Sequence, residues 1–293
     1  MWDKIVAFFM SIIYFIAGLL GFPCAKNCYE YRDLAYGTHE RQILDLNIPK
    51  ENDGQIGLIL YIHGGAWVAG DKDGYEETLE YMSETYGYAC AAINYRYIGA
   101  DTHCDDIMND IDLALTKIKE IGEEVDVNIN KVLLTGGSAG GHLSLLYGYS
   151  RAKTAPITPA AVVSDCGPTD LTDSNFYINN ALGDEEFVCD IFSYGCGFDF
   201  DYAQRADAKQ ALLEASPLYY VNENTVPTVI NHGMKDSIVP YSNAVSLDAK
   251  LTEYGITHYL NTFPNSDHDL GSDSENRELG NKLLLEYADE YLN

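Results

Sequence analysis

The chain has 293 residues and is 46% hydrophobic, enough apolar material for the buried core of one large α/β domain. Its 45 acidic and 18 basic side chains give a formal charge of −27 at pH 7. A surface this acidic repels phosphate backbones, so no nucleic-acid partner is expected. The acidic residues are dispersed rather than gathered in one block, and we attribute them to solubility.

The beginning of the chain differs in composition from the rest. Residues 5–22, IVAFFMSIIYFIAGLLGF, carry no charge over 18 positions. As a helix this stretch would reach about 27 Å, just short of a hydrocarbon core of about 30 Å. It predicts that residues 1–28 are a signal peptide or a short membrane anchor, with residues 29–293 forming the main domain. The protein is then exported, either secreted or membrane-anchored. A helix packed on the domain is the alternative, which the lack of a polar face disfavours.

The seven cysteines include two close pairs, Cys24 with Cys28 and Cys189 with Cys196. In an exported domain either pair could form a disulfide, and the second pair lies in a stretch that we predict to be a loop. No pair has a second pair at zinc-finger spacing, so no structural metal is expected.

The rest of the chain alternates short apolar runs with longer amphipathic ones. Six runs read as strands, at residues 56–65, 88–95, 130–137, 160–167, 226–233 and 257–263, and the first two read as buried. Four read as helices, at residues 105–122, 141–150, 243–255 and 275–292. Near-continuous apolar strands that alternate with helices predict a mostly parallel sheet with helices on both faces.

Residues 171–215 interrupt this alternation. The segment is rich in Asp, Asn and aromatic residues, and most of it has no clear period. Such an insertion can form a pocket wall above the strand ends, or it can be a surface excursion. Its aromatic side chains could stack on a sugar or aryl group, or form a small core of the insertion itself; they are Phe176, Tyr177, Phe187, Phe192 and Tyr194.

A single serine stands among small residues in Gly136-Gly137-Ser138-Ala139-Gly140. It lies between a predicted strand and a predicted helix, the setting in which a sharp turn exposes a nucleophile. Small neighbours allow the turn and give a substrate carbonyl access to the hydroxyl. A phosphate-binding loop is the alternative, but the P-loop lysine and the G-x-G-x-x-G spacing are both missing.

A serine nucleophile needs a base, usually histidine, and an acid that orients the base. His268 lies in a polar loop after the last predicted strand, and Asp236 lies in the loop after the strand before it. The order Ser138, Asp236, His268 matches nucleophile, acid and base in hydrolases with this kind of turn. Taken singly, Asp236 could cap the helix that follows it, and His268 could be a solvated loop residue.

Backbone donors for an oxyanion are predicted at two places. The segment IHGGAW follows an early strand, and its glycines allow N–H groups to turn towards the serine. We predict that Gly65, Ala66 and Ala139 supply the donors, with Gly64 as a substitute. His63 is expected to hold this loop by hydrogen bonding, and Trp67 to form a wall of the substrate pocket.

The segments YIHGGAWVAGDK, INYR, TGGSAGGHLSLL, ASPLYYV, INHGMKDSIVP and DHDL together resemble α/β-hydrolases of the carboxylesterase type. They look closest to the bacterial esterase/lipase branch that includes carbohydrate and feruloyl esterases, and the likeness runs from about Tyr31 to Leu292. It implies an α/β-hydrolase fold with a mostly parallel eight-stranded sheet, helices on both faces and residues 171–215 as a cap-like insertion. It also implies a Ser-His-Asp serine esterase that acts on a small-molecule or carbohydrate ester without a cofactor.

Two departures bear on the branch. The loop reads His-Gly-Gly-Ala-Trp rather than His-Gly-Gly-Gly, and Asn94 stands where lipase-like members usually carry Asp; both favour the carbohydrate-esterase-like members. Three other functions share parts of this pattern: an aryl-formamide hydrolase, a serine peptidase of the prolyl-oligopeptidase type, and a catalytically inactive binding module. The first would use the same triad, and the second usually carries an N-terminal propeller. The sequence leaves the oligomeric state open.

Overall fold

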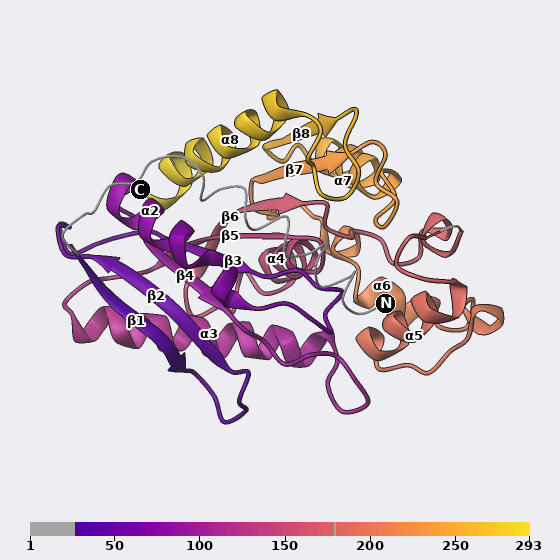
Figure 1. Cartoon of the computed structure of the whole chain (residues 1–293), viewed down its shortest axis with the longest axis horizontal. Helices are drawn as coiled ribbons and strands as arrows, with labels where there is room; N and C mark the ends of the chain where they lie inside the picture. Colours follow the sequence, from indigo (N-terminus) through magenta and orange to yellow (C-terminus); the bar gives the residue numbers. More distant parts are fainter. Residues whose placement is uncertain (1–26, 179) are drawn as a thin grey trace.

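The computed structural model describes residues 27–178 and 180–293 (Figure 1). These residues form one eight-stranded sheet in the order β1-β2-β4-β3-β5-β6-β7-β8. β1 and β2 pair antiparallel, as do β2 and β4, and all the other neighbours are parallel. The strands are β1 (Cys28–Ala35), β2 (Ile43–Pro49), β3 (Leu58–Ile62), β4 (Ala89–Ile93), β5 (Lys131–Gly137), β6 (Thr158–Asp165), β7 (Thr228–Gly233) and β8 (His258–Phe263).

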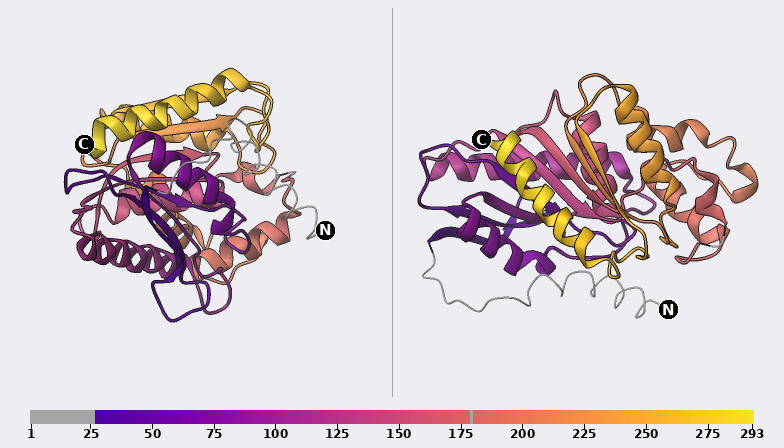
Figure 2. Two further views of the ribbon diagram at one scale, coloured as in Figure 1. Left: turned by 60° about the vertical axis from the view of Figure 1, so that its left-hand side comes forward. Right: turned by 90° about the horizontal axis from the view of Figure 1, so that it is seen from above.

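Helices cover both faces of this sheet (Figures 1 and 2). Their bounds are α2 (Glu76–Tyr86), α3 (Cys104–Glu124), α4 (Ala139–Ser150), α5 (Glu185–Cys196), α6 (Lys209–Glu214), α7 (Ser242–Glu253) and α8 (Ser274–Leu292). Short 3₁₀ turns are η2 (Lys72–Tyr75), η3 (Ser174–Tyr177), η4 (Tyr202–Gln204) and η5 (Pro217–Tyr220). No helix within residues 27–178 and 180–293 is long and apolar enough to cross a membrane.

The core divides into two layers because successive side chains of a strand point to opposite faces. Leu58, Leu60 and Ile62 of β3 pack in one apolar cluster with α3, α4 and α7. Ile59 and Tyr61 pack in a second cluster with α2 and α8. All five side chains are buried, which explains why the strand reads as an uninterrupted apolar run.

The predicted mostly parallel sheet with helices on both faces is confirmed. The antiparallel edge, β1 and β2, was not among the strands assigned from the pattern, because half of β1 is only partly buried and its sequence is polar. α4 begins at Ala139, directly after the serine, rather than at residue 141. The apolar segment at residues 5–22 lies outside the described residues.

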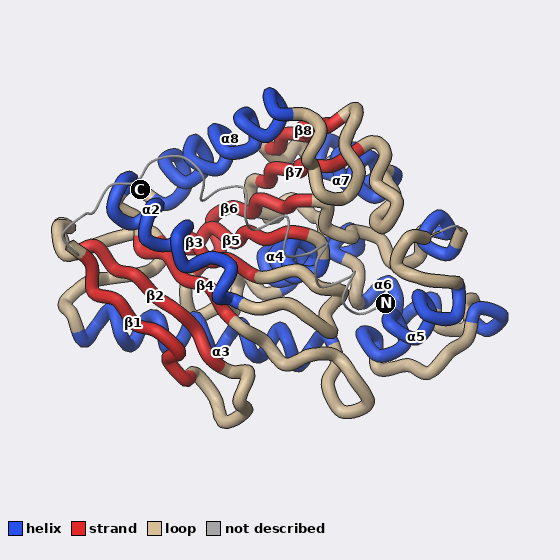
Figure 3. Tube along the Cα trace, viewed as in Figure 1, coloured by secondary structure: helices blue, strands red, loops and turns tan. Residues whose placement is uncertain are grey.

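The insertion at residues 171–215 is more regular than its sequence indicates. It contains α5 and α6 with their connecting turns, and Figure 3 shows these helices beyond the ends of the central strands. Cys189 and Cys196 therefore lie on one helix rather than in a loop, and both are free thiols. Seven residues of helix separate them by about 10 Å, too far for a disulfide. The predicted disulfide between Cys189 and Cys196 is thus wrong. The other predicted pair, Cys24 with Cys28, is not tested, because Cys24 lies outside the described residues.

The close approach of α4 to β3 depends on Gly140. A Cβ at this position would overlap the carbonyl oxygen of Ile62 and lie 2.8 Å from that of His63. We therefore expect Gly140→Ala to lower the free energy of unfolding by about 1–3 kcal/mol or more. Urea denaturation measures this. The matched change is Gly99→Ala, where a Cβ would meet no atom within 4 Å. Equal stability of the two variants would contradict the prediction.

Candidate active site

Ser138 occupies a sharp turn between β5 and the first residue of α4. Its backbone has φ 55° and ψ −122°, a left-handed conformation that is strained for a residue with a side chain. Its N–H donates to the carbonyl of Asp165 on β6 over 2.7 Å, which ties the turn to the neighbouring strand. The turn holds the hydroxyl at the head of α4, where the helix dipole favours developing negative charge.

The loop after β3 lies directly beside this turn. A Cβ at Gly64 would be 2.8 Å from the carbonyl oxygen of Gly137 and 3.4 Å from Cβ of Ser138. In the same loop Ala66 and Trp67 also have positive φ angles, 50° and 60°. Such strain in adjacent loops is typical of functional sites.

The predicted oxyanion donors share one property. Within residues 27–178 and 180–293, the N–H groups of Gly65, Ala66 and Ala139 donate to no acceptor in the protein. Backbone N–H groups are normally paired when they are not in contact with water. Three unused donors beside a serine can therefore receive an oxyanion.

Asp236 and His268 form a buried pair. Nδ1 of His268 lies 2.8 Å from Oδ2 of Asp236, and both side chains are fully buried. The other carboxylate oxygen accepts the N–H groups of Ile238 and Val239 at 2.9 and 2.8 Å. Because Nδ1 donates to the carboxylate, the proton of a neutral His268 ring is on Nδ1 and the lone pair is on Nε2.

A second histidine supports the same carboxylate. Nε2 of His232 lies 3.3 Å from Oδ2 of Asp236 and also 3.0 Å from the carbonyl of Val239. Burial opposes ionisation of Asp236, but the electrostatic interactions and hydrogen bonds with the rings of His268 and His232 outweigh it and lower the pKa of the carboxyl. Asp236 is therefore ionised at neutral pH, as an acid that orients a base must be. This contact was not predicted from the sequence.

One group of side chains has the composition of a metal site. Among the described residues, ligand atoms of Cys166, His232 and Asp236 lie within 4.8 Å of one another. The same carboxylate already accepts a hydrogen bond from His268, so a cation there would compete with His268 for it. We therefore interpret this group as hydrogen-bonding support for Asp236.

Ser138 and the Asp236 loop open into the same cavity. Its walls include Ser138, Ile238 and Val239. The N–H groups of Ile238 and Val239 are the ones that donate to the carboxylate of Asp236. The three predicted triad residues follow β5, β7 and β8, whose carboxyl ends lie at one edge of the parallel sheet. The structure thus places the predicted nucleophile in one cavity with the loop that carries Asp236, to which His268 is bonded from the loop after β8.

The insertion and Trp67 close the other side of this cavity. Phe176, Phe187 and Phe192 are among its lining residues, together with Trp67. The ring of Phe192 meets those of Phe176 and Trp67 edge to face, with centroids 5.3 and 6.3 Å apart. The aromatic residues of the insertion therefore form a small core and a pocket wall at once. The cavity that they leave has a volume of only about 20 Å³.

Trp67 is held in place by His142. Its indole N–H donates to Nδ1 of His142 over 3.2 Å, and Nε2 of His142 bonds the carbonyl of Ala215 over 2.8 Å. Burial lowers the pKa of His142 to about 4, and burial likewise lowers the pKa of His63 to about 4. Both rings are therefore neutral at pH 7.

These two histidines predict acid sensitivity. Each binds a proton with a pKa of 6.5 when unfolded and about 4 when folded, so the unfolded state takes up more protons as the pH falls through this window. The contribution of these two rings to stability is thus greatest above pH 6.5, and by pH 4.5 it falls by roughly 2–3 kcal/mol for each ring. Urea denaturation at pH 7.5 and 4.5 measures the loss. We expect His142→Gln to show a smaller loss than the unchanged protein, and an equal loss would contradict this account.

A mostly parallel eight-stranded sheet, a strained serine between β5 and α4, and a buried Asp–His pair after β7 and β8 define the α/β-hydrolase class. The chain belongs to the BD-FAE family, whose model matches residues 44–251. This confirms the resemblance found in the sequence.

Individual relatives agree with this assignment. The chain is 29% identical over 234 residues to the probable carboxylic ester hydrolase LipM of Mycobacterium tuberculosis, covering 72% of this chain and 49% of LipM. The chain thus spans about half the length of the curated relatives it matches. A truncated carbohydrate esterase from gut microbiota has a similar fold, with a TM-score of 0.72, 19% identity and coverage of 92% of this chain and 100% of that one. Esterase B of Lactobacillus rhamnosis has a TM-score of 0.74, with 18% identity and coverage of 98% and 93%.

Proposed function

We propose that the protein is a carboxylic ester hydrolase that works through Ser138, His268 and Asp236. The observation that carries this proposal is the strained, bare serine in a cavity that is also lined by Ile238 and Val239, two residues of the loop that contains Asp236, the partner of His268. Membership of the BD-FAE family and the likeness to esterases support the same reaction.

In the proposed reaction, Nε2 of His268 takes the proton of Ser138 while its oxygen attacks the ester carbonyl. The carbonyl oxygen becomes an oxyanion, which accepts from the N–H groups of Gly65, Ala66 and Ala139. His268 then protonates the leaving alcohol, and an acyl group remains on Ser138. Water, activated by the same histidine, releases the acid and restores the serine.

We further propose that the acyl group is small and that the alcohol is a carbohydrate or aryl group. The cavity beside Ser138 has a volume of about 20 Å³, close to that of one water-sized group. Such a space suits the methyl of an acetyl group better than a long acyl chain. A carbohydrate esterase among the structural neighbours supports the alcohol side of the proposal.

A substrate panel on the full chain tests this function. It compares p-nitrophenyl acetate, butyrate and octanoate with methyl ferulate, acetylated xylan and N-formylkynurenine. We expect the fastest turnover with the acetyl esters and the slowest with octanoate. Turnover of the formamide alone would keep the serine mechanism but contradict ester hydrolysis. No turnover of any substrate by folded protein would contradict the proposal as a whole.

The wall formed by α5 gives a sharper test of the acyl preference. Phe187 lines the cavity and is only partly buried, so Phe187→Ala enlarges the space at modest cost in stability. We expect the ratio of octanoate to acetate turnover to rise by roughly 10-fold or more. Phe198→Ala is the matched control, because Phe198 follows the same helix, is 42% exposed and does not line the cavity. An unchanged ratio in Phe187→Ala would show that this wall does not limit the acyl chain.

We also propose that the protein is exported, on the basis of the uncharged residues 5–22. Cell fractionation tests this: the full chain is expected in the membrane or in the medium, and recovery of the unprocessed chain from the cytoplasm alone would contradict it.

A further inference from the structure

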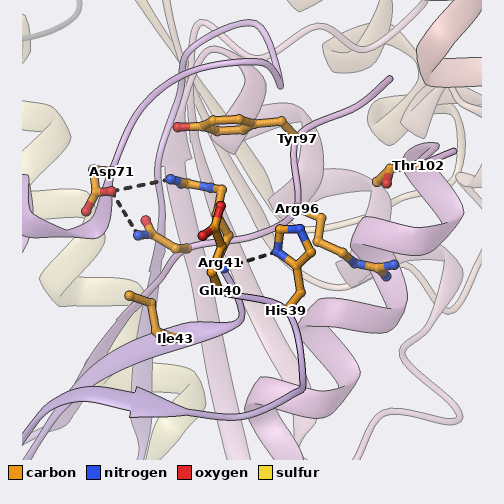
Figure 4. Close-up of a pocket in the computed structure, with 9 residues that line it drawn as sticks. His39, Glu40, Arg41, Ile43, Asp71, Arg96, Tyr97 and Thr102 are labelled. Carbon is orange, nitrogen blue, oxygen red and sulfur yellow. Dashed lines mark hydrogen bonds and ion pairs between the residues drawn. The ribbon is translucent and has the colours of Figure 1, made fainter. Parts of the chain in front are cut away.

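Arg41 lies behind the loop after β3 and contacts both of its ends. Nη2 of Arg41 is 3.2 Å from Nε2 of His63 and donates to the carbonyl of Gly70 over 3.1 Å. Nε donates to the carbonyl of Tyr95 over 2.9 Å. The ring of Tyr97 covers the guanidinium at 3.9 Å, as Figure 4 shows. The side chain is therefore fixed by contacts on its edges and one face.

Arg41 does not reach the cavity that contains Ser138. It lines a separate pocket of about 560 Å³, together with Asp71 and Arg96 (Figure 4). Nη1 of Arg41 lies 3.5 Å from Asp71 in this pocket. Any effect of Arg41 on the reaction must therefore pass through the loop that it holds.

The contact with Arg41 decides which nitrogen of His63 carries the proton. A guanidinium has donors and no acceptor, so Nε2 of His63 must accept from it. The ring proton is then on Nδ1, which lies 2.8 Å from the carbonyl oxygen of Gly64 and donates to it. Stacking on Tyr95, with ring centroids 4.2 Å apart, holds the ring in this plane.

This hydrogen bond fixes the orientation of one peptide group. The described residues contain no cis peptide bond, so the carbonyl of Gly64 and the N–H of Gly65 point in opposite directions. With the carbonyl turned to His63, the N–H of Gly65 points away from that ring. It is one of the three predicted oxyanion donors, none of which has an acceptor within the described residues.

We propose that Arg41 is a positioning residue for the oxyanion hole: it selects the Nδ1–H tautomer of His63, which locks the Gly64–Gly65 peptide and aims the N–H of Gly65 at the reacting carbonyl. This inference rests on the proposed ester hydrolysis, because Gly65 is a predicted donor in that reaction. Arg41 touches neither the substrate nor the reacting atoms.

The test is Arg41→Lys, which keeps the positive charge but cannot bond His63, Gly70 and Tyr95 together. We expect kcat for p-nitrophenyl acetate to fall on the order of 10- to 100-fold with little change in KM, since the donor acts mainly on the transition state. Nitrogen chemical shifts of the histidine rings should show that His63 no longer holds the proton on Nδ1 alone. Arg96→Lys is the matched control from the same pocket, because Arg96 pairs with Asp110 instead of His63.

A second variant separates positioning from general loss of structure. In His63→Asn the amide N–H can replace Nδ1–H as the donor to Gly64, and it has no tautomer to select. We therefore expect Arg41→Lys to cost much less activity when added to His63→Asn than when added to the unchanged protein. Equal costs in the two backgrounds, or unchanged kcat and an unchanged His63 tautomer in Arg41→Lys, would overturn the proposal.

The tautomer measurement also separates this inference from the proposed function. If the unchanged protein hydrolyses no ester, ester hydrolysis fails, and the ring shifts alone decide the role of Arg41. Loss of the Nδ1–H form in Arg41→Lys then supports the positioning role, and its retention overturns it.

Discussion

Replacing Ser138 with alanine is expected to abolish ester hydrolysis, with kcat lower on the order of 10⁶-fold. The proposed acyl-enzyme cannot form without the hydroxyl, and what remains is binding and the N–H groups around the oxyanion. Alanine has the same Cβ as serine and fits the same turn, whose φ of 55° is already strained. The change should therefore remove the chemistry and leave the fold intact. Turnover of p-nitrophenyl acetate measures the effect.

The control for Ser138→Ala uses another serine of the same helix. Ser150 ends α4, is exposed, and its hydroxyl bonds the carbonyl of Leu146, so Ser150→Ala should keep full activity. A fluorophosphonate probe should label the unchanged protein and Ser150→Ala but not Ser138→Ala. An unchanged melting temperature would show that Ser138→Ala is folded. Full activity in that folded variant would rule out Ser138 as the nucleophile.

Replacing Asp236 with asparagine is expected to lower kcat by about 10⁴-fold. In the unchanged protein the N–H groups of Ile238 and Val239 both donate to one carboxylate oxygen, and the amide oxygen of asparagine can accept them in the same way. The amide NH₂ would then face Nδ1 of His268, where the carboxylate now lies at 2.8 Å. Two donors cannot face each other, so His268 would move its proton to Nε2 and lose the lone pair that accepts the serine proton.

A second Asp–His pair provides the matched control. Oδ1 of Asp248 lies 3.2 Å from Nε2 of His258 near the surface, away from the cavity. Asp248→Asn makes the same chemical change there and should leave kcat within about 2-fold, because neither residue lines the cavity. If Asp236→Asn lost no more activity than Asp248→Asn, Asp236 would not be the acid that orients the base.

Much of the candidate site could be predicted because the residue patterns that indicate it lie close together in the sequence. The glycines that allow the turn lie within a few residues of Ser138. At Gly140, for example, a Cβ would overlap the carbonyl oxygen of Ile62 at the end of β3. Asp236 and His268 each follow a run that was assigned as a strand from its sequence. Parallel strands align their carboxyl ends, so residues that follow such strands meet at one edge of the sheet.

Other features were mispredicted or missed because they depend on distant contacts. Cys189 and Cys196 read as a loop disulfide, yet they lie on α5, whose apolar face is buried against the cavity. The period of this helix is masked in the sequence by aromatic residues that pack on the domain as well as on each other. Likewise, no local pattern indicates that His232 supports Asp236.

The sequence by itself determined the alternation of strands and helices, the bare serine at the end of a strand, and the order of the three proposed triad residues. Apolar periodicity and glycine placement encode these features, since they act over a few residues. Only the tertiary structure decided that α5 narrows the cavity beside Ser138 and that Arg41 holds His63. Periodicity indicates that a side chain is buried but not which residue it contacts. Arg41 and His63 are 22 residues apart in the chain, and Ser138 and α5 are more than 40 residues apart.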